Sequence, residues 1–263
     1  MKQRIISAAI LLSIVIICVF TSDITRVLLF AVCGILCAYE YSRAVERLGA
    51  FCAAWVMYVY IAVQAVLSLF HAGTLRYLAC YTGGIYLALF SGIVHRGVSG
   101  KGALYTLAGL AYPSFLFGIL MMISVSDIWL TTFVLATSAT WICDTFALLG
   151  GRRFGKHKLA PQVSPNKTIE GSFCGALAAV IVGVIIRVLP IFPELSLRLC
   201  ITTCLISSSL GQIGDLAESL IKRMIGVKDF SDLIPGHGGM FDRTDSLLFS
   251  IPTAFICLHI AGL

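Results

Sequence analysis

Apolar runs of about 17 to 25 residues, the length that spans a hydrocarbon core of about 30 Å, recur along the whole chain. Because lipid offers no hydrogen-bond partner to a backbone amide, each run must satisfy its own amides, which predicts helices. Only 12% of the residues are charged, against roughly 25% in soluble domains. We therefore expect an all-α, polytopic integral membrane protein with about nine transmembrane helices, at residues 5–21, 24–40, 50–70, 77–94, 103–123, 128–149, 171–189, 197–214 and 246–263.

The basic residues test this topology, because cytoplasmic loops of membrane proteins carry an excess of Lys and Arg. With a cytoplasmic N-terminus and nine crossings, fifteen of the nineteen Lys and Arg residues fall on the cytoplasmic side. The other four sit in or beside helix ends, where long side chains can reach the interface: Arg26, Arg76, Arg187 and Arg198. We therefore predict a multi-pass protein of the cell (inner) membrane, with its N-terminus in the cytoplasm.

The first apolar run, Ile5 to Phe20, follows Lys2 and Arg4 and has features of a secretory signal peptide. No small-residue cleavage site follows it, since Thr21-Ser22-Asp23 leads directly into another apolar segment. We expect the run to be the first spanning helix. Most of the ten cysteines lie inside apolar runs, which predicts buried small side chains rather than disulfides or a soft-metal site.

Two connections are long and polar, residues 150–170 and 215–245. Long loops in a compact protein are usually functional or disordered, and these contain spaced Gly, Pro and mixed charges rather than a low-complexity run. We predict an N-terminal transmembrane region of about five helices, residues 1–127. A C-terminal catalytic region of about four helices, residues 128–263, would carry both loops on the cytoplasmic side.

The loop at 150–170 combines five cations with one acid, which suits an anion site or a patch for lipid headgroups. A basic loop that only sets the topology is the alternative from charge alone. The end of the loop surrounds Lys167 with hydroxyl groups and glycine just before a helix, where backbone amides form a ready phosphate site. We expect substrate contacts from Lys156, Ser164, Lys167 and Thr168.

The loop at 215–245 interleaves acids with cations. Spacings of three and four residues place one set on a single helix face: Asp215, Glu218, Ser219 and Lys222. Asp242 and Asp245 share a face in the same way. Carboxylates about 4 Å apart repel one another by about 4 kcal/mol at an effective dielectric of 20, and a divalent cation removes this cost. Oxygen ligands without Cys favour magnesium or manganese, and magnesium commonly joins one or two carboxylates to substrate phosphates.

Two further polar residues stand out. Asp144 lies inside an apolar segment, where a carboxylate is costly, so it is expected to face a polar cavity; an acid that reaches out from the helix end is the alternative. His237 lies in a glycine-rich stretch and could contact phosphate or act as an acid, although a lone loop histidine is as often structural or solvated. Both are candidate substrate-binding residues.

Three segments resemble the C-terminal signature of the bacterial phosphatidate cytidylyltransferases, also called CDP-diacylglycerol synthases: Ser219 to Arg223, Lys228-Asp229, and Pro235 to Asp245. The first loop resembles the same family through Asp144, Phe154-Gly155-Lys156, Lys158-Leu159, Pro161, Ser164-Pro165, Lys167-Thr168 and Glu170-Gly171. Many members carry an aromatic residue in place of Leu148 and a Trp in place of Ile169. The resemblance covers roughly the last 120 residues, and the rest matches only as a multi-helix region.

This resemblance implies transfer of CMP from CTP to phosphatidate, giving CDP-diacylglycerol and pyrophosphate, for phospholipid biosynthesis. It implies a requirement for Mg²⁺, with a second cation left open, bound by Asp215, Asp242 and Asp245. The phosphatidate phosphate would attack the α-phosphorus of CTP, a reaction that depends mainly on positioning and charge stabilisation. The expected partners are CTP, phosphatidate, the bilayer and a second copy in a homodimer, with no nucleic acid. Phosphate contacts are expected from Lys167, Lys222, Arg223 and Arg243.

Other membrane functions predict different sequence features. A secondary transporter would show two related hydropathic halves with polar residues near the midplane, whereas here the charge lies in loops and no internal repeat is evident. A CDP-alcohol phosphotransferase would carry spaced Asp-Gly and Ala-Arg motifs that this chain lacks. A lipid kinase, a different lipid acceptor, and a membrane scaffold without activity stay open as alternatives.

Overall fold

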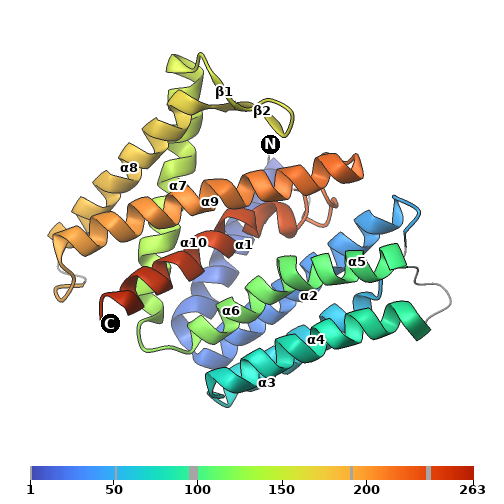
Figure 1. The fold of residues 1–263 in the computed structure, drawn as a ribbon. Helices are drawn as coiled ribbons and strands as arrows, with labels where there is room; N and C mark the ends of the chain where they lie inside the picture. Colours follow the sequence, from blue (N-terminus) through green and yellow to red (C-terminus); the bar gives the residue numbers. More distant parts are fainter. Residues whose placement is uncertain (1, 51, 95–99, 190–191, 235–237) are drawn as a thin grey trace. The chain divides into compact units, whose positions relative to one another are not determined.

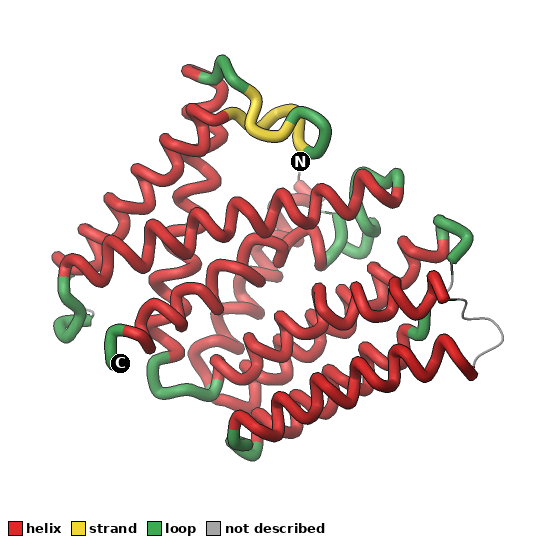
Figure 2. Tube along the Cα trace, viewed as in Figure 1, coloured by secondary structure: helices red, strands yellow, loops and turns green. Residues whose placement is uncertain are grey.

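The computed structural model describes every residue except 1, 51, 95–99, 190–191 and 235–237 (Figure 1). The predicted site residue His237 lies outside the described residues. Helices make up nearly all of the regular structure, and the strands form one short hairpin (Figure 2). The elements in chain order are α1 (Lys2–Thr21), α2 (Asp23–Glu46), α3 (Ala54–Leu69), α4 (Thr74–Val94), α5 (Gly100–Gly109), the π-helix η1 (Leu110–Ser114), α6 (Phe115–Ser124), α7 (Trp129–Phe154), β1 (Lys158–Ala160), β2 (Ser164–Thr168), α8 (Ile169–Val188), α9 (Leu197–Ile225) and α10 (Phe241–Ile260).

The all-α membrane architecture is confirmed at the level of helix content and hydropathy. Among the described residues, six helices are long and apolar enough to cross a membrane: Asp23–Glu46, Thr74–Val94, Gly100–Ser124, Trp129–Phe154, Ile169–Val188 and Leu197–Ile225. Shorter apolar helices cover Leu12–Thr21 and Ala54–Leu69. Each predicted apolar segment overlaps a helix of the described chain, while the total of nine crossings stays a prediction.

The two long polar connections are more helical than expected. Helix α7 continues to Phe154, and helix α9 continues past its apolar part to Ile225. The extension of α9 follows from the spacing of Asp215, Glu218, Ser219 and Lys222, which suits a helix that leaves an apolar environment with a polar face. The segment between α9 and α10 therefore shortens to residues 226–240.

The described chain divides into two compact units. The first consists of Met1–Ser126 together with Ile225–Arg243, and the second consists of Asp127–Met224 together with Thr244–Leu263. The predicted division into regions 1–127 and 128–263 stays a prediction, because Ile225–Arg243 groups with the N-terminal helices. Helix α10 begins in the first unit and continues in the second.

In the first unit, α2 packs against α3 and α6. Gly34 of α2 permits this approach, because a Cβ at this position would lie only 3.1 Å from the Phe117 Cβ of α6. Phe117 is fully buried there, as are Met57 and Ile61 of α3. Close contact through a small residue is the usual way for membrane helices to gain packing energy where lipid supplies no hydrophobic drive.

In the second unit, α7 and α8 pack closely along each other. A Cβ at Gly175 of α8 would lie 2.7 Å from the Cys143 carbonyl oxygen, so only glycine fits between the two backbones. The core of this unit consists of Leu135, Ala139, Cys143, Ala179, Val182, Ile186, Phe192, Leu195, Cys200, Cys204 and Leu258. Large apolar side chains on the other face of α8 are exposed, as expected for contact with lipid: Phe173, Leu177 and Ile181.

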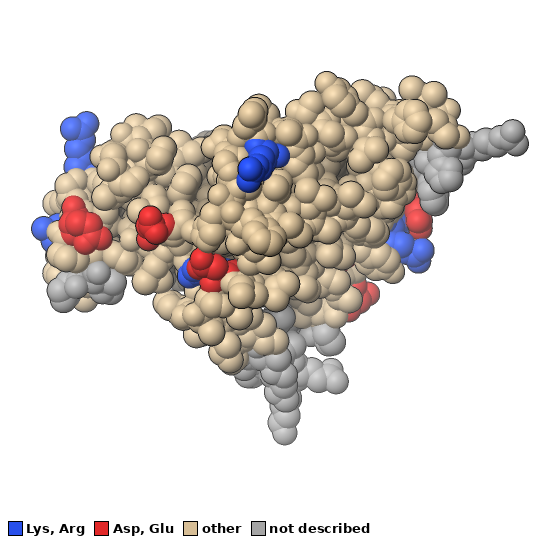
Figure 3. Space-filling model, turned by 90° about the horizontal axis from the view of Figure 1, so that it is seen from below, with Lys and Arg blue, Asp and Glu red and all other residues tan. Residues whose placement is uncertain are grey.

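One face of the molecule also carries few charged side chains. In Figure 3, Lys, Arg, Asp and Glu occupy small separate patches, and other residue types make up most of the face in view. Such a surface suits the hydrocarbon region of a bilayer, where an isolated charge is costly.

Candidate active site

The hairpin of β1 and β2 brings the first predicted motif to the start of α8. The strands pair antiparallel, with Lys158 opposite Thr168 and Ala160 opposite Ser164. Thr168 is the N-cap of α8, and its Oγ1 accepts a hydrogen bond from the Gly171 amide at 3.1 Å. This contact accounts for the Thr-Ile-Glu-Gly order, since Thr is a favoured N-cap residue. Thr168, predicted as a substrate contact, is therefore occupied as a helix cap.

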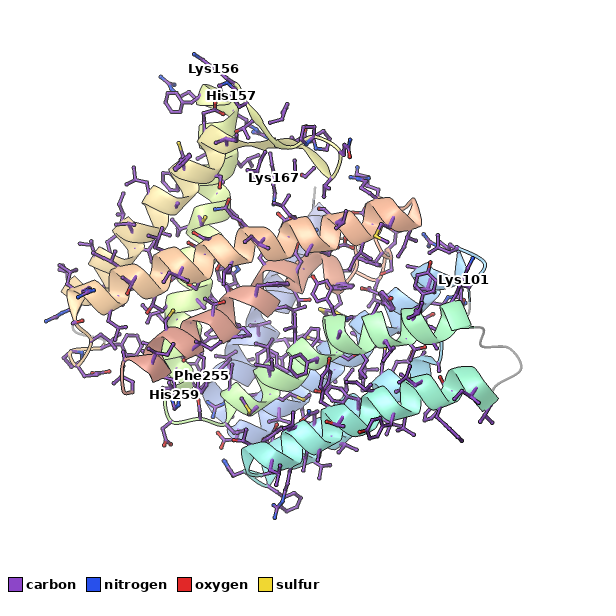
Figure 4. The ribbon with its side chains drawn as sticks, in the orientation of Figure 1. Lys101, Lys156, His157, Lys167, Phe255 and His259 are labelled. Atoms are coloured by element: carbon purple, nitrogen blue, oxygen red, sulfur yellow. The ribbon has the colours of Figure 1, made fainter. Side chains whose placement is uncertain are left out.

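Glu170 closes the turn between α7 and β1. Its carboxylate accepts hydrogen bonds from the Lys156 and His157 amides, and one oxygen lies 2.6 Å from His157 Nδ1. The His157 side chain is 74% exposed. Lys156 and His157 lie together at the end of α7, at a distance from Lys167 on the hairpin (Figure 4). The structure thus separates Lys156 from the lysine with which it was grouped in the sequence.

Lys167 connects the two predicted motifs. Its Nζ lies 2.5 Å from Asp215 Oδ2, so strand β2 and helix α9 meet through this ion pair. Both side chains are partly covered, with 26% of Lys167 and 31% of Asp215 exposed. Charge-assisted contacts of this kind are stronger than neutral hydrogen bonds. Figure 4 shows Lys167 extending from the hairpin toward the helices below it.

Two further carboxylates, from two other helices, interact electrostatically with this pair. Asp144 of α7 interacts electrostatically with both Asp215 and Lys167. Asp245 of α10 interacts with Asp215, Asp144 and Lys222. Like charges in a medium of reduced dielectric repel by several kcal/mol at contact distance, so the group requires cations. Lys167 and Lys222 supply two of them. We call Asp144, Lys167, Asp215, Lys222 and Asp245 the acid–lysine cluster.

One face of α9 supports this cluster, which confirms the predicted helical spacing. Lys222 Nζ lies 2.5 Å from Oε2 of Glu218, whose side chain is fully buried. Ser219 Oγ lies 3.5 Å from Asp215 Oδ1. A buried carboxylate must be paired, and truncation of one partner would leave the other charge uncompensated. Glu218 therefore anchors the lysine that faces Asp245.

The α9 backbone approaches α10 at the cluster. A Cβ at Gly214 would lie 2.6 Å from the Asp245 carbonyl oxygen and 2.7 Å from Phe249 Cδ2. Gly214 directly precedes Asp215, so the absence of a side chain at this position lets the two acidic residues come together. Just below, Gln212 accepts a hydrogen bond from Ser172 Oγ at 2.6 Å and donates one to Cys143 Sγ at 3.1 Å, linking α7, α8 and α9.

Arg223, a predicted phosphate contact, is used to hold the hairpin. Its Nε donates a hydrogen bond to the Val163 carbonyl oxygen at 3.2 Å, in the turn between β1 and β2. The side chain is otherwise exposed. Ser164, the first residue of β2, is partly buried beside the turn. The hairpin thus contacts α9 at its turn through Arg223 and at its second strand through Lys167.

Asp242 has a different environment from Asp215 and Asp245. It belongs to the first unit, and its Oδ2 accepts hydrogen bonds from the Phe230 amide at 3.1 Å and the Gly239 amide at 2.9 Å. Arg243, next to it, is exposed. Within the described part of the chain, no three His, Cys, Asp or Glu side chains form a group that could hold a metal ion. The three predicted ligands therefore do not constitute a complete set in this structure.

The structure adds one acid that the sequence analysis did not single out. Glu40 of α2 is 1% exposed and accepts hydrogen bonds from the segment that leads into α10. An available signal was the position of this residue, an ionisable side chain at the end of an apolar segment and flanked by Tyr39 and Tyr41. Such residues are functional candidates by default in membrane proteins.

Comparison with known proteins points in one direction. The sequence model described as the cytidylyltransferase family matches residues 2–261. Curated proteins named phosphatidate cytidylyltransferase are similar over 118 residues, with 44% identity in Staphylococcus epidermidis and 45% in Staphylococcus saprophyticus and Staphylococcus aureus. The similar stretch spans 45% of this chain and 45% of each relative, so less than half of either is covered.

Proposed function

Since this chain belongs to the cytidylyltransferase family, we propose that it is a membrane-bound phosphatidate cytidylyltransferase that converts CTP and phosphatidate into CDP-diacylglycerol and pyrophosphate. The observation that carries the proposal is the Lys167–Asp215 ion pair, which brings the two predicted motifs into one acid–lysine cluster. The Staphylococcus relatives named for this activity support the choice of substrates.

In the proposed reaction, a phosphate oxygen of phosphatidate attacks the α-phosphorus of CTP. The new phosphorus–oxygen bond forms as the bond to the β-phosphate breaks, and the electron pair leaves with pyrophosphate. The protein contributes positioning and charge stabilisation rather than covalent catalysis. Lys167, whose side chain is partly exposed, could exchange Asp215 for a phosphate oxygen, while Lys222, held by buried Glu218, would supply a fixed positive charge. Such an exchange would leave Asp215 without its counterion unless another cation takes that place.

The donor chemistry of the cluster fits magnesium. Asp144, Asp215 and Asp245 offer only carboxylate oxygens, and Asp215 already holds a cation in the form of the Lys167 ammonium. Magnesium commonly uses one or two protein carboxylates and completes its coordination with water and substrate phosphates. We favour Asp215 and Asp245 as the protein ligands; Asp242 as a ligand, and a second cation, stay predictions. When bound, the ion would neutralise charge on the triphosphate.

The membrane setting suits a lipid substrate. Six described helices can cross a bilayer, and the C-terminal halves of α7 and α9 carry three members of the acid–lysine cluster, Asp144, Asp215 and Lys222. We propose that the C-terminal ends of these two helices lie on the cytoplasmic side of the inner membrane, where CTP is available and where basic residues are favoured. A homodimer is also proposed, on the family resemblance alone.

The test is lipid labelling. Membranes that contain the overexpressed chain are incubated with CTP labelled in its cytosine ring, with phosphatidate and with magnesium, and the lipids are then extracted. We expect label in the lipid phase only when phosphatidate and free magnesium are both present, and loss of labelling on addition of EDTA. Membranes from cells without the overexpressed chain set the background. Absence of incorporation by correctly inserted protein would overturn the proposal, and incorporation with another lipid would reassign the acceptor.

A further inference from the structure

Glu40 binds the segment that precedes α10 through both of its carboxylate oxygens. Oε1 accepts hydrogen bonds from Ser231 Oγ at 2.5 Å and from the Met240 amide at 2.9 Å, and Oε2 accepts one from the Phe241 amide at 2.9 Å. Phe241 is the first residue of α10. The first amides of a helix have no partner within the helix and favour a negative charge. A single residue of α2 thus satisfies the start of α10 and the loop before it.

The same loop is held a second time by Asp242. Its Oδ2 accepts from the Phe230 and Gly239 amides, so the two ends of residues 230–239 are fastened to one carboxylate. The ring of Phe241 is fully buried and stacks on Phe230, with centroids 4.7 Å apart. It also contacts Tyr112 edge-on at 5.1 Å. The described residues at the two ends of this loop are therefore held by a polar clamp and lie beside an aromatic core.

Gly239 shows how closely Glu40 approaches. A Cβ built on Gly239 would lie 2.7 Å from Glu40 Oε2, 2.8 Å from Oε1 and 2.9 Å from Cδ. The backbone of Gly239 does not have a positive φ, unlike that of Gly238. Glycine is needed at position 239 because of the carboxylate and not because of the backbone conformation. This gives the contact a geometric signature that a substitution can test.

Glu40 is a buried carboxylate, and such a group is tolerated in a membrane protein only when it has hydrogen-bond or ionic partners. Its side chain is 1% exposed, and an ionised carboxylate in such a place is costly unless it is hydrogen-bonded on both oxygens. Glu46, on the same helix, is instead 40% exposed and forms an ion pair with Arg43 at the surface. The contrast separates a clamp in the interior from an ordinary surface ion pair.

We propose that Glu40 is a positioning residue of this enzyme, which fixes Ser231, Met240 and the first turn of α10. Within this turn lie Asp242 and Arg243, and Asp245 follows one turn later on the same helix. Where α10 begins sets the rotation and the depth of these side chains. The proposal rests on the proposed function for its kinetic consequence, whereas its structural part does not.

The structural part is tested by amide hydrogen exchange on detergent-solubilised protein, with the peptide that spans residues 229–243 as the readout. We expect Glu40→Ala and Glu40→Gln to raise exchange in this peptide, since the Met240 and Phe241 amides lose an anionic acceptor. The matched control is Glu46→Gln, which changes the same residue type on the same helix and should leave the peptide unchanged. Unaltered exchange in both Glu40 variants would overturn the clamp.

The kinetic part is tested in the lipid-labelling assay. If a Glu40 variant only reduced the fraction of folded protein, the maximal rate would fall and the KM for CTP would be unchanged. Displacement of Arg243, a proposed phosphate contact, should also raise the KM for CTP, by about tenfold, because small misplacements of binding groups are expensive. Glu40→Asp retains the charge on a shorter side chain and should recover part of both parameters. A normal KM in Glu40→Gln, with the loop shown to be loosened, would overturn the positioning role.

A double variant uses the geometry of Gly239. Gly239→Ala alone should be harmful, since its methyl group overlaps the Glu40 carboxylate. In a Glu40→Ala background the methyl group meets no carboxylate, so Gly239→Ala should add little further loss. Fully additive effects would show that the two residues do not act on each other and would count against the proposal. Should the wild-type chain fail to label lipid, the proposed function falls, and the exchange measurement still decides whether Glu40 holds the loop.

Discussion

The two sequence motifs lie in the hairpin of β1 and β2 and in the loop before α10. These two regions differ in whether the contacts that hold them are accessible to solvent or buried. The hairpin is held by half-exposed or exposed groups, Lys167 with Asp215 and Arg223 with the Val163 carbonyl. The loop is held by a buried carboxylate, Glu40, and by the stacked rings of Phe230 and Phe241. Contacts that solvent can reach contribute less stability and exchange partners more readily than a buried carboxylate with all its hydrogen bonds. The comparison indicates that the hairpin is held less tightly than the described ends of the loop.

The largest effect is expected from Asp215, the residue that the hairpin meets on α9. Asp215→Asn keeps the size of the side chain but removes the charge that pairs with Lys167 and that a magnesium ion would use. We expect loss of lipid labelling by more than about a hundredfold at every magnesium concentration, comparable to removal of a charged group that stabilises the transition state. Insertion into the membrane should be unaffected, which is measured by the amount of protein extracted. Near-normal turnover would remove Asp215 from the active site.

A substitution of Lys167 tests whether the partly exposed contact of the hairpin takes part in substrate binding. Lys167→Ala should raise the KM for CTP and lower kcat together, by about ten- to a hundredfold in kcat/KM, because a cation that changes partners contributes to binding and to rate. Lys158, an exposed lysine on the other strand of the hairpin, provides the matched control as Lys158→Ala. An enzyme unchanged by Lys167→Ala would leave the first loop with a role in topology alone.

Packing beneath the cluster gives an intermediate effect. Gly214→Ala would place a methyl group 2.6 Å from the Asp245 carbonyl oxygen, and overpacking of this kind costs about 1–3 kcal/mol. We expect a lower unfolding temperature in detergent and reduced activity. Gly83→Ala is the control, because Gly83 lies within helix α4 and has no atom within 4 Å of an added Cβ. Equal behaviour of the two variants would contradict the close approach of α9 to α10.

The smallest effect is expected from the residues that flank the hairpin, His157 before β1 and Glu170 after β2. Glu170 and His157 form an exposed contact beside the Lys156 amide, away from Lys167. Glu170→Gln keeps an oxygen that can accept an amide hydrogen bond, so we expect little change in kcat or in the KM for CTP, as for most exposed ion pairs. Comparing the kinetics of Glu170→Gln with those of Lys167→Ala would show whether the effect of the hairpin on activity depends on Lys167 alone. A large loss in Glu170→Gln would extend the site to the start of β1.

Much of this site could be predicted from residue spacing. The face of α9 that carries Asp215, Ser219 and Lys222 follows from the period of a helix, and the basic and acidic motifs mark where charges gather in an otherwise apolar chain. The roles within the motifs could not be predicted in this way. Thr168 caps a helix, Arg223 holds a turn, and Asp242 accepts amides of its own loop, because each side chain binds the nearest unsatisfied backbone group once the chain is folded.

By itself, the sequence determined that much of this chain is suited to a lipid environment and that its regular structure is mainly helical. Apolar runs long enough to cross a bilayer must be helical, since no other arrangement satisfies their amides in lipid, and this holds whatever the helices contact. Tertiary structure alone decided which distant residues meet. Lys167 reaches Asp215 across 48 positions of the chain, and Glu40 binds amides 200 residues away, through close packing at Gly214 and Gly239. Such pairings depend on how helices approach one another, which no local spacing specifies.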